Sequence, residues 1–310
     1  MDELIRKLLP ILLLLVIGYF AKQRKLFSAN FIEELKGMII KIALPAVLFD
    51  AFSTMSLQIS YLLLFVLIFV YCCLLYFIGY GLHKFFPNTF KRFFTKGYMT
   101  GFEFGMIGVG LFGAIWGMDK LPIIMLVGFG HELFIWFFYV QFISKDTGSI
   151  NILGSIKQFI KMPTIIAIVL GVTANLSGFR LIMNENVIGQ SLLSVIQFLK
   201  PLTSPLILIV IGYTMVFQRT HLREAAVYIF SRLVLTLSLG MLVFIAVMKI
   251  IPGVDDLFIQ AFFAFILLPA PYILPLYIKD QVEATFFTQL LIYSTAVSFV
   301  GYGILVWFSF

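Results

Sequence analysis

Charged residues are scarce in this chain. Only 12% of its 310 residues are charged, whereas 61% are hydrophobic and the mean hydropathy is +1.05. Soluble domains carry about 25% charged residues, and a water-soluble fold could not hide so much apolar surface. The apolar residues come in runs of about 20, the helix length that crosses about 30 Å of hydrocarbon. The composition therefore predicts an all-α polytopic membrane protein.

Cysteines and catalytic signatures are also few. Cys72 and Cys73 are adjacent within an apolar run, which suits neither a disulfide framework nor a metal site. The sequence has no Gly-x-x-x-x-Gly-Lys phosphate loop, no His-Glu-x-x-His and no Gly-x-Ser-x-Gly. We therefore expect no catalytic residue, no metal site and no cofactor. An ATP-driven pump is disfavoured, and any energy coupling should use an ion gradient of H+ or Na+.

The positions of the positive charges indicate how the chain is oriented in the membrane. The net charge is +7, but Lys and Arg stand at the ends of apolar runs, so we expect no nucleic-acid partner. Apolar runs between polar breaks predict ten membrane segments, at about 7–22, 38–55, 59–82, 97–117, 121–143, 162–179, 187–217, 225–248, 256–278 and 286–309. The connections after the odd-numbered segments hold 14 Lys and Arg residues, whereas the opposite side holds 5. Because positive residues stay in the cytoplasm, both termini should lie outside the cell membrane.

The longest polar connection, 144–161, lies at the middle of the chain and divides the segments into five and five. An odd number per half means that the second half enters the membrane from the opposite side. This pattern predicts two inverted five-helix repeats, residues 1–150 and 151–310.

Helix-breaking residues support this duplication. Pro45 in segment 2 and Pro205 in segment 7 are 160 residues apart. At nearly the same offset, a glycine cluster in segment 4 corresponds to two prolines in segment 9: Gly105, Gly108 and Gly110 with Pro269 and Pro271. Proline removes a backbone donor and glycine tolerates unwound geometry, so segments 4 and 9 should both be interrupted near their centres.

Two interrupted helices that cross would form a binding site. A break at mid-depth is tolerable only where it is buried in protein or lines a cavity. Its N-terminal half-helix ends suit an anion and its C-terminal ends suit a cation. The alternative is that these residues only kink the helices for close packing. The predicted substrate-binding residues are Glu103, Gly105, Gly108, Gly110, Pro269, Pro271, Tyr272, Ile273, Pro45 and Pro205.

Ionisable residues inside the apolar runs are candidates for coupling, because a charge at depth is costly. Glu103 lies next to the predicted break and is expected either to line the site or to be a neutral structural carboxyl. His131 and Glu132 could relay protons or simply bond other helices. Lys200, just before Pro201, is a possible partner for an acidic substrate or for Glu103.

Three other charges are given structural roles. Asp50 lies toward the outer end of segment 2, where water could solvate it. Lys41 and Arg232 lie near cytoplasmic ends, where long side chains extend to the interface.

Five short stretches, taken together and in order, resemble the auxin efflux carrier family, which includes bacterial malate or malonate permease-like proteins and plant PIN-type carriers. They are Leu44-Pro-Ala-Val-Leu-Phe49, Gly105-Met-Ile-Gly-Val-Gly110, Lys161-Met-Pro-Thr-Ile-Ile-Ala-Ile-Val-Leu-Gly171, Pro205-Leu-Ile-Leu-Ile-Val-Ile-Gly212 and Ser294-Thr-Ala-Val-Ser298. The resemblance spans about 250 residues.

The resemblance implies a ten-helix fold in which segments 4 and 9 cross. It also implies a scaffold of segments 1, 2, 6 and 7, a transport domain of segments 3–5 and 8–10, an elevator-like movement, a homodimer and organic anion substrates. The chain departs from the family pattern at the crossing. Glu103 stands at a usual Asn, Gly110 at a usual proline, and Ile273 at a second usual Asn, so the charge of the solute is open.

We therefore expect an integral membrane protein, surrounded by lipid, that acts as a secondary active transporter. Its solute would be a small organic molecule, with a carboxylate or related organic anion as the first expectation. The alternatives are a carrier of a neutral or cationic solute and a non-transporting membrane sensor or interaction protein on the same fold.

Overall fold

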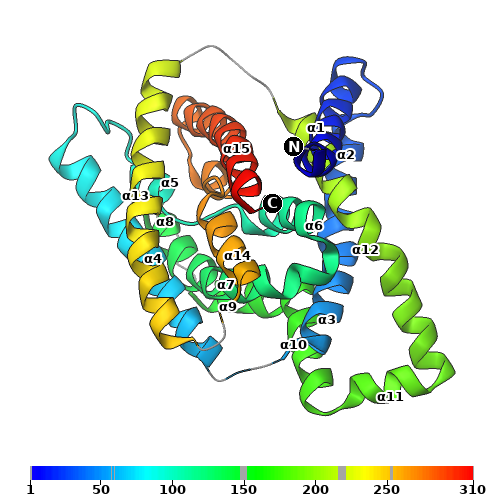
Figure 1. Ribbon diagram of the computed structural model, residues 1–310. Helices are drawn as coiled ribbons and strands as arrows, with labels where there is room; N and C mark the ends of the chain where they lie inside the picture. Colours follow the sequence, from blue (N-terminus) through cyan, green and yellow to red (C-terminus); the bar gives the residue numbers. More distant parts are fainter. Residues whose placement is uncertain are drawn as a thin grey trace. The chain divides into compact units, whose positions relative to one another are not determined.

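The computed structural model describes residues 2–56, 58, 60–146, 152–215, 221–251 and 254–309, and every regular element in these ranges is helical (Figure 1). The prediction of an all-helical protein is confirmed for this part of the chain. Residues 147–151 of the predicted central connection, and Arg219 among the basic residues, lie outside it.

Fifteen α-helices and five short π or 3-10 turns make up the described chain. The α-helices are α1 (Asp2–Gln23), α2 (Ala29–Met38), α3 (Leu44–Thr54), α4 (Ser60–Phe85), α5 (Thr95–Met99), α6 (Val109–Trp116), α7 (Leu121–Phe134), α8 (Val140–Asp146), α9 (Ile152–Ile160), α10 (Pro163–Leu176), α11 (Phe179–Glu185), α12 (Val187–Thr214), α13 (Leu222–Ile250), α14 (Asp256–Ile266) and α15 (Gln281–Ser309). The π-helical turns are η1 (Ile39–Ala43), η2 (Phe104–Gly108) and η4 (Ile135–Tyr139), and the 3-10 turns are η3 (Met118–Lys120) and η5 (Leu274–Tyr277).

Each of the ten predicted segments contains helix, but they differ in length and continuity. By length and apolar composition, six helical stretches of the described chain can span a membrane. A seventh is added if α10 and α11, which are bent by 82° at their junction, count as one span. Several helices of the described chain are thus long and apolar enough to span a membrane, whereas ten crossings and the inverted repeat stay predictions.

Two of the helix-breaking residues, Pro45 and Pro205, do not interrupt their helices. Pro45 is the second residue of α3, which follows the π turn η1 without a gap, and Pro205 lies inside α12. The π turn at 39–43 is a local adjustment of the kind that lets a membrane helix pass a proline. Neither proline therefore opens the backbone, and their part in solute binding stays a prediction.

The described chain divides into two compact units. Unit 1 consists of Met1–Leu57, Gly105–Ile123 and Lys157–Met215, and unit 2 of Gln58–Phe104, Ile124–Ile156 and Val216–Phe310. Each unit is assembled from stretches that are far apart in the sequence, so long-range packing holds it together.

Glycines allow the helices of unit 1 to approach closely. α1 packs along α12, dark blue and yellow-green in Figure 1. Gly18 faces the backbone of Ile209, and Gly212 faces the backbone carbonyl of Leu15. α10 packs on α3 in the same way, because a side chain at Gly171 would meet the Phe49 carbonyl at 2.8 Å. Small residues at such contacts are the usual basis of tight helix pairing in membranes.

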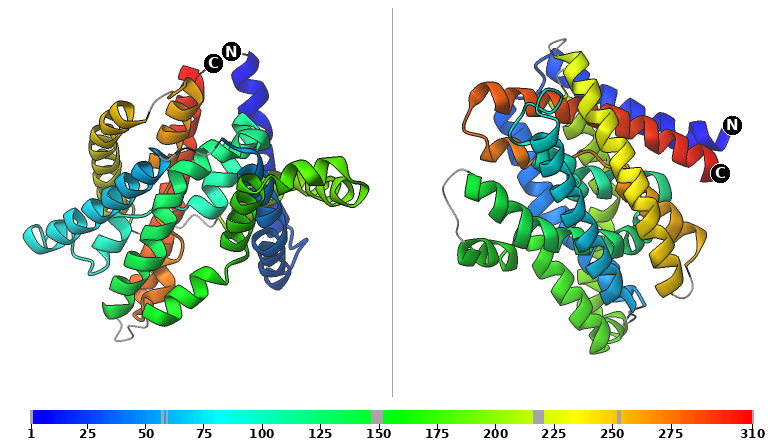
Figure 2. Two further views of the ribbon diagram at one scale, coloured as in Figure 1. Left: turned by 90° about the horizontal axis from the view of Figure 1, so that it is seen from below. Right: turned by 90° about the vertical axis from the view of Figure 1, so that its left-hand side faces the viewer.

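Unit 2 has an aromatic core between α4, α7, α13, α14 and α15. α13 lies beside α4, as Figure 2 also shows. The Tyr71 hydroxyl on α4 donates a hydrogen bond of 2.8 Å to the Thr236 carbonyl on α13. On α7, Gly130 accommodates the backbone of Phe65 and Gly128 accommodates the ring of Phe104. These contacts position Phe104, the first residue of η2 in segment 4.

We predict that Gly212→Ala destabilises unit 1, because its methyl group would overlap the Leu15 carbonyl. Overpacking of this kind costs about 1–3 kcal/mol. The measurement is the thermal unfolding midpoint of the purified protein in detergent. The control is Gly37→Ala, where the added carbon meets nothing within 4 Å. Equal midpoints for the two variants would contradict the proposed close contact of α1 and α12.

Candidate functional site

The backbone of segment 4 is interrupted at residues 100–103. α5 ends at Met99, residues 101–103 have no regular structure, and helix resumes with the π turn at Phe104. Gly101 has a φ of +67°, a left-handed conformation that favours glycine. A side chain at this position would also meet the ring of Pro271 at 2.6 Å. The prediction that segment 4 is broken is therefore correct.

The predicted position of that break is wrong. Gly105 and Gly108 lie in η2 and Gly110 lies in α6, so all three are helical. Gly110 allows close packing against Ile207 within unit 1. A side chain added at Gly105 would meet nothing within 4 Å. Glycine permits unwinding but does not require it, so a cluster of glycines could not locate the break. Their role as substrate contacts stays a prediction.

Segment 9 is interrupted where the sequence predicts it. α14 ends at Ile266, and η5 begins at Leu274. The intervening stretch contains Pro269 and Pro271, which lack the backbone N–H that a helix would use. Ile273 is the last residue before η5.

The two interruptions contact each other within unit 2. The Glu103 N–H donates to the Pro269 carbonyl at 2.8 Å. In return, the Tyr272 N–H donates to Oε2 of Glu103, also at 2.8 Å. The Tyr272 hydroxyl is hydrogen-bonded to Oγ1 of Thr295 on α15 at 2.6 Å. Glu103, Pro269, Pro271 and Tyr272 are thus brought together, and each break supplies polar partners for the other.

Arg232 stabilises the end of the first half of segment 4. Its guanidinium donates to the carbonyls of Tyr98 at 2.6 Å and Gly101 at 2.5 Å, and it lies over the Phe102 ring, 5.1 Å from the centroid. The last carbonyls of a helix have no partner within that helix, and a cation there also suits the helix dipole. The prediction that Arg232 extends to the interface is wrong, because only 4% of it is exposed.

Sequence reasoning missed this arginine, although a signal was present. Arg232 is in α13, a helix of 29 residues, with long apolar stretches on both sides. A cation at that depth needs a buried partner. Its distance from either end of the run could have identified it as part of the site.

His131 and Glu132 lie beside the same break. His131 is 1% exposed, and its Nε2 accepts a hydrogen bond of 2.9 Å from the Phe102 N–H. Glu132 follows it on α7, with Oε1 at 3.6 Å from Nδ1 of His131. Both readings from the sequence therefore still apply, since His131 bonds another segment and also faces a carboxylate.

Lys200 has a different partner from those expected. In unit 1 its ammonium group donates to Oδ2 of Asp50 at 2.7 Å, and Arg180 donates to Oδ1 of the same carboxylate at 2.8 Å. Asp50 is only 6% exposed, so the prediction that water solvates it is wrong. The two cations compensate the buried carboxylate and join α3 to α11 and α12. Lys200 is therefore a member of this ion-pair cluster.

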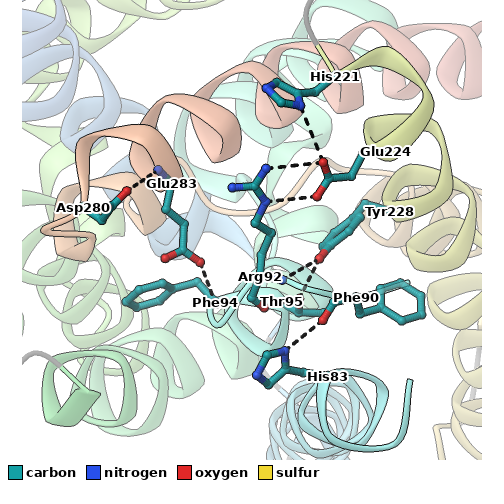
Figure 3. A network of polar contacts seen from close by, with 10 residues as sticks. All are labelled: His83, Phe90, Arg92, Phe94, Thr95, His221, Glu224, Tyr228, Asp280 and Glu283. Atoms are coloured by element: carbon teal, nitrogen blue, oxygen red, sulfur yellow. Dashed lines mark hydrogen bonds and ion pairs between the residues drawn. The ribbon is translucent and has the colours of Figure 1, made fainter. Parts of the chain in front are cut away.

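A second polar network in unit 2 fixes the connection that precedes α5 (Figure 3). Arg92 donates from Nε and Nη2 to the two carboxylate oxygens of Glu224, at 3.0 and 3.3 Å. These hydrogen bonds raise the pKa of the Arg92 guanidinium. The Arg92 N–H also donates to the Tyr228 hydroxyl at 3.2 Å, and the Phe94 N–H donates to Glu283 at 3.4 Å. The start of segment 4 is thereby held to the first turns of α13 and α15.

A cavity of about 390 Å³ lies between α13, α14, residues 267–269 and α15. Its lining is mostly apolar, with Arg232, Ser294 and Ser298 among the polar residues. Pro269 is the predicted site residue that it contacts. Its rim reaches the surface at Phe308, which is 83% exposed. The volume is that of a pocket for a small organic molecule.

Apolar helices of membrane-spanning length indicate a polytopic membrane protein, and two interrupted segments contact each other within it. Residues 3–153 match the family described as membrane transport protein. This match, over the first half of the sequence, supports the resemblance to the auxin efflux carrier family of membrane transport proteins. No curated protein matches the chain.

We predict that Arg232→Met destabilises the protein by about 3–6 kcal/mol, because the Tyr98 and Gly101 carbonyls would each lose a charged donor worth about 1.5–3 kcal/mol. Unfolding in detergent, followed by circular dichroism, measures this change. Arg223→Met is the matched control, since Arg223 lies exposed on the first turn of the same helix. Equal effects of the two substitutions would contradict a buried role for Arg232.

Proposed function

We propose that the protein is a secondary active transporter that binds a small organic solute at the contact between the breaks of segments 4 and 9. The observation that carries this proposal is the reciprocal hydrogen bonding of Glu103 with Pro269 and Tyr272. Interrupted membrane helices present backbone donors and acceptors to a solute at a depth where water is scarce. A solute could replace one of these mutual contacts without leaving a peptide group unpaired.

The chemistry of the site supports two classes of solute. The family resemblance favours a carboxylate or related organic anion. Glu103, however, directs its carboxylate at the Tyr272 N–H, a donor that an anion would otherwise use. An anion would therefore bind when Glu103 is protonated, because two ionised carboxylates at one donor repel each other. The second candidate is a neutral or cationic solute, which an ionised Glu103 carboxylate would not repel.

The division into two compact units supports an elevator-like movement. Unit 2 contains both members of the contact, residues 101–104 and 267–272, so its movement would carry the site as a whole. Unit 1 contains segments 1, 2, 6 and 7, which correspond to the expected scaffold, together with residues 105–123. We propose this scaffold as the homodimer interface, with both termini outside the cell membrane.

Uptake into proteoliposomes tests the proposal against that of a non-transporting sensor. We predict accumulation of a radiolabelled organic solute that depends on the protein and on an imposed proton or sodium gradient. Mono- and dicarboxylates, amino acids and amines would be compared in parallel vesicles with the gradient present or collapsed by an ionophore. If none of these classes enters faster than into protein-free vesicles, the sensor is the better explanation.

We predict that Glu103→Gln alters the pH dependence of transport without unfolding the protein. The glutamine amide can still accept from the Tyr272 N–H through its oxygen, but it cannot change charge. For an anionic solute, uptake by the variant should persist at high pH, where wild-type uptake falls because Glu103 is ionised. For a cationic solute, uptake should instead fall about tenfold or more at all pH values.

The control for this substitution is Glu185→Gln, because Glu185 is an exposed residue at the end of α11. Initial rates from pH 5 to 9 would be compared for both variants and the wild type. A Glu103→Gln profile that coincides with the wild-type profile would reduce Glu103 to a packing residue.

A further inference from the structure

The hydrogen bond between Phe102 and His131 determines which nitrogen of the imidazole carries its proton. A backbone N–H can only donate, so Nε2 of His131 must hold a free lone pair to accept it at 2.9 Å. The neutral ring therefore has its proton on Nδ1. That nitrogen is buried and has no hydrogen-bond partner among the described residues. The acid nearest to it is Glu132, at 3.6 Å, which is too long for a hydrogen bond but within ion-pair distance.

Glu132 connects this buried ring to the outside of unit 2. The Trp136 indole N–H donates to Oε2 of Glu132 at 3.3 Å and so orients the carboxylate, leaving Oε1 toward His131. The Glu132 side chain is 22% exposed, whereas the His131 side chain is 2% exposed. The partly exposed Glu132 carboxylate thus faces the Nδ1 side of the ring, where it would stabilise a positive charge on the imidazole.

The other residues around His131 are aromatic rings and the charged side chains of two neighbouring segments. The rings of Phe102, Phe104 and Phe265 lie with their centroids 5.6 to 6.2 Å from that of the imidazole. On α13, Arg232 stacks over the far partner, Phe102, and opposes a second positive charge. In segment 4, Glu103 follows Phe102, and its carboxylate favours a positive charge on His131. A proton is a ligand that needs no cavity, so burial of the ring does not prevent its binding.

We propose that His131 and Glu132 form a proton-binding site in which protonation of His131 and its hydrogen bond to Phe102 exclude each other. The proton adds to the Nε2 lone pair, the Nδ1 proton stays, and the imidazolium pairs with the Glu132 carboxylate. The Phe102 N–H then loses its acceptor and becomes a free donor one residue before Glu103. The break in segment 4 therefore has two states, which differ by one proton.

This inference rests on the proposed function for its consequence, because it names the proton as the coupling ion. A solute that accepts a hydrogen bond from the freed Phe102 N–H would favour protonation of His131. By linkage, protonation of His131 would favour that solute to the same extent. A carboxylate or carbonyl oxygen is the acceptor that suits this donor, so solute and proton would bind together.

The first test observes the proton directly and needs no solute. The protein would be labelled with 15N-histidine, placed in lipid nanodiscs and titrated from pH 4.5 to 9 by NMR. We expect His131 to show the Nδ1–H tautomer at high pH and to become doubly protonated within this range. His83→Gln and His221→Gln assign the other two signals. An Nε2–H tautomer at high pH, or a neutral ring throughout the range, would overturn the proposal.

The second test follows the backbone in the same samples. Hydrogen exchange at residues 100–104, corrected for the intrinsic effect of pH, should show at least a tenfold loss of protection of Phe102 as His131 titrates. His131→Gln offers an amide oxygen to the same N–H but cannot titrate, so its protection should not change with pH. A His131 titration without loss of Phe102 protection in the wild type would also overturn the proposal.

Glu132→Gln serves as the second variant, because it leaves the Phe102 bond in place. It should weaken proton binding by His131 at least tenfold in the NMR titration, and an unchanged midpoint would remove Glu132 from the site. Proteoliposome uptake separates this inference from the proposed function. Loss of proton-driven acceleration in His131→Gln, with gradient-independent solute entry retained, supports the coupling role. Absence of any uptake by the wild type would count against transport while leaving the NMR result to decide the proton site.

Discussion

The need to pair every peptide group in hydrocarbon determines the structure around the break in segment 4. An unpaired group there costs several kcal/mol, and the break frees carbonyls on one side and N–H groups on the other. Arg232 takes the carbonyls, His131 takes the Phe102 N–H, and Pro269 takes the Glu103 N–H. The irregular backbone is therefore possible only because three other segments of unit 2 supply its partners.

These partners differ in what they can do. The Arg232 guanidinium stays charged over the whole physiological pH range, so it donates to its two carbonyls permanently and supports the break without changing state. Imidazole and carboxyl groups change their hydrogen-bonding capacity when they gain a proton. Under the proposals above, His131 and Glu103 are the points at which a backbone N–H can be released, that of Phe102 in segment 4 and that of Tyr272 in segment 9. In this network Arg232 provides stability, whereas the proposed function depends on His131 and Glu103.

The sequence predicted the elements of this network better than their connections. Run length and hydropathy identify the helical segments because both follow from the thickness of the bilayer. The break in segment 9 could be located because proline cannot donate a hydrogen bond, as at Pro269. The break in segment 4 was misplaced because glycine is compatible with helix, and the positive φ at the break belongs to Gly101, which lies outside the glycine cluster.

The partners of buried charges could not be predicted for a different reason. Asp50 and Lys200 are 150 residues apart, and Arg232 is 131 residues from Gly101. Nothing in a single sequence relates positions at such separations. Burial depth was the one local signal, and it shows that a partner is needed without showing which residue provides it.

The charges around the break relate the identity of the solute to the direction of coupling. With Glu103 and Glu132 ionised and His131 neutral, Arg232 leaves one negative charge in excess among these four residues. An anion adds to that excess, and in a medium of low dielectric it would bind only with protons on His131 and Glu103. A cation would instead be attracted to the deprotonated site and repelled by the protonated one. Under the proposed function, these residues would give symport of protons with an anionic solute and exchange of protons for a cationic one. The sign of the solute's charge would then fix the direction in which a proton gradient drives it.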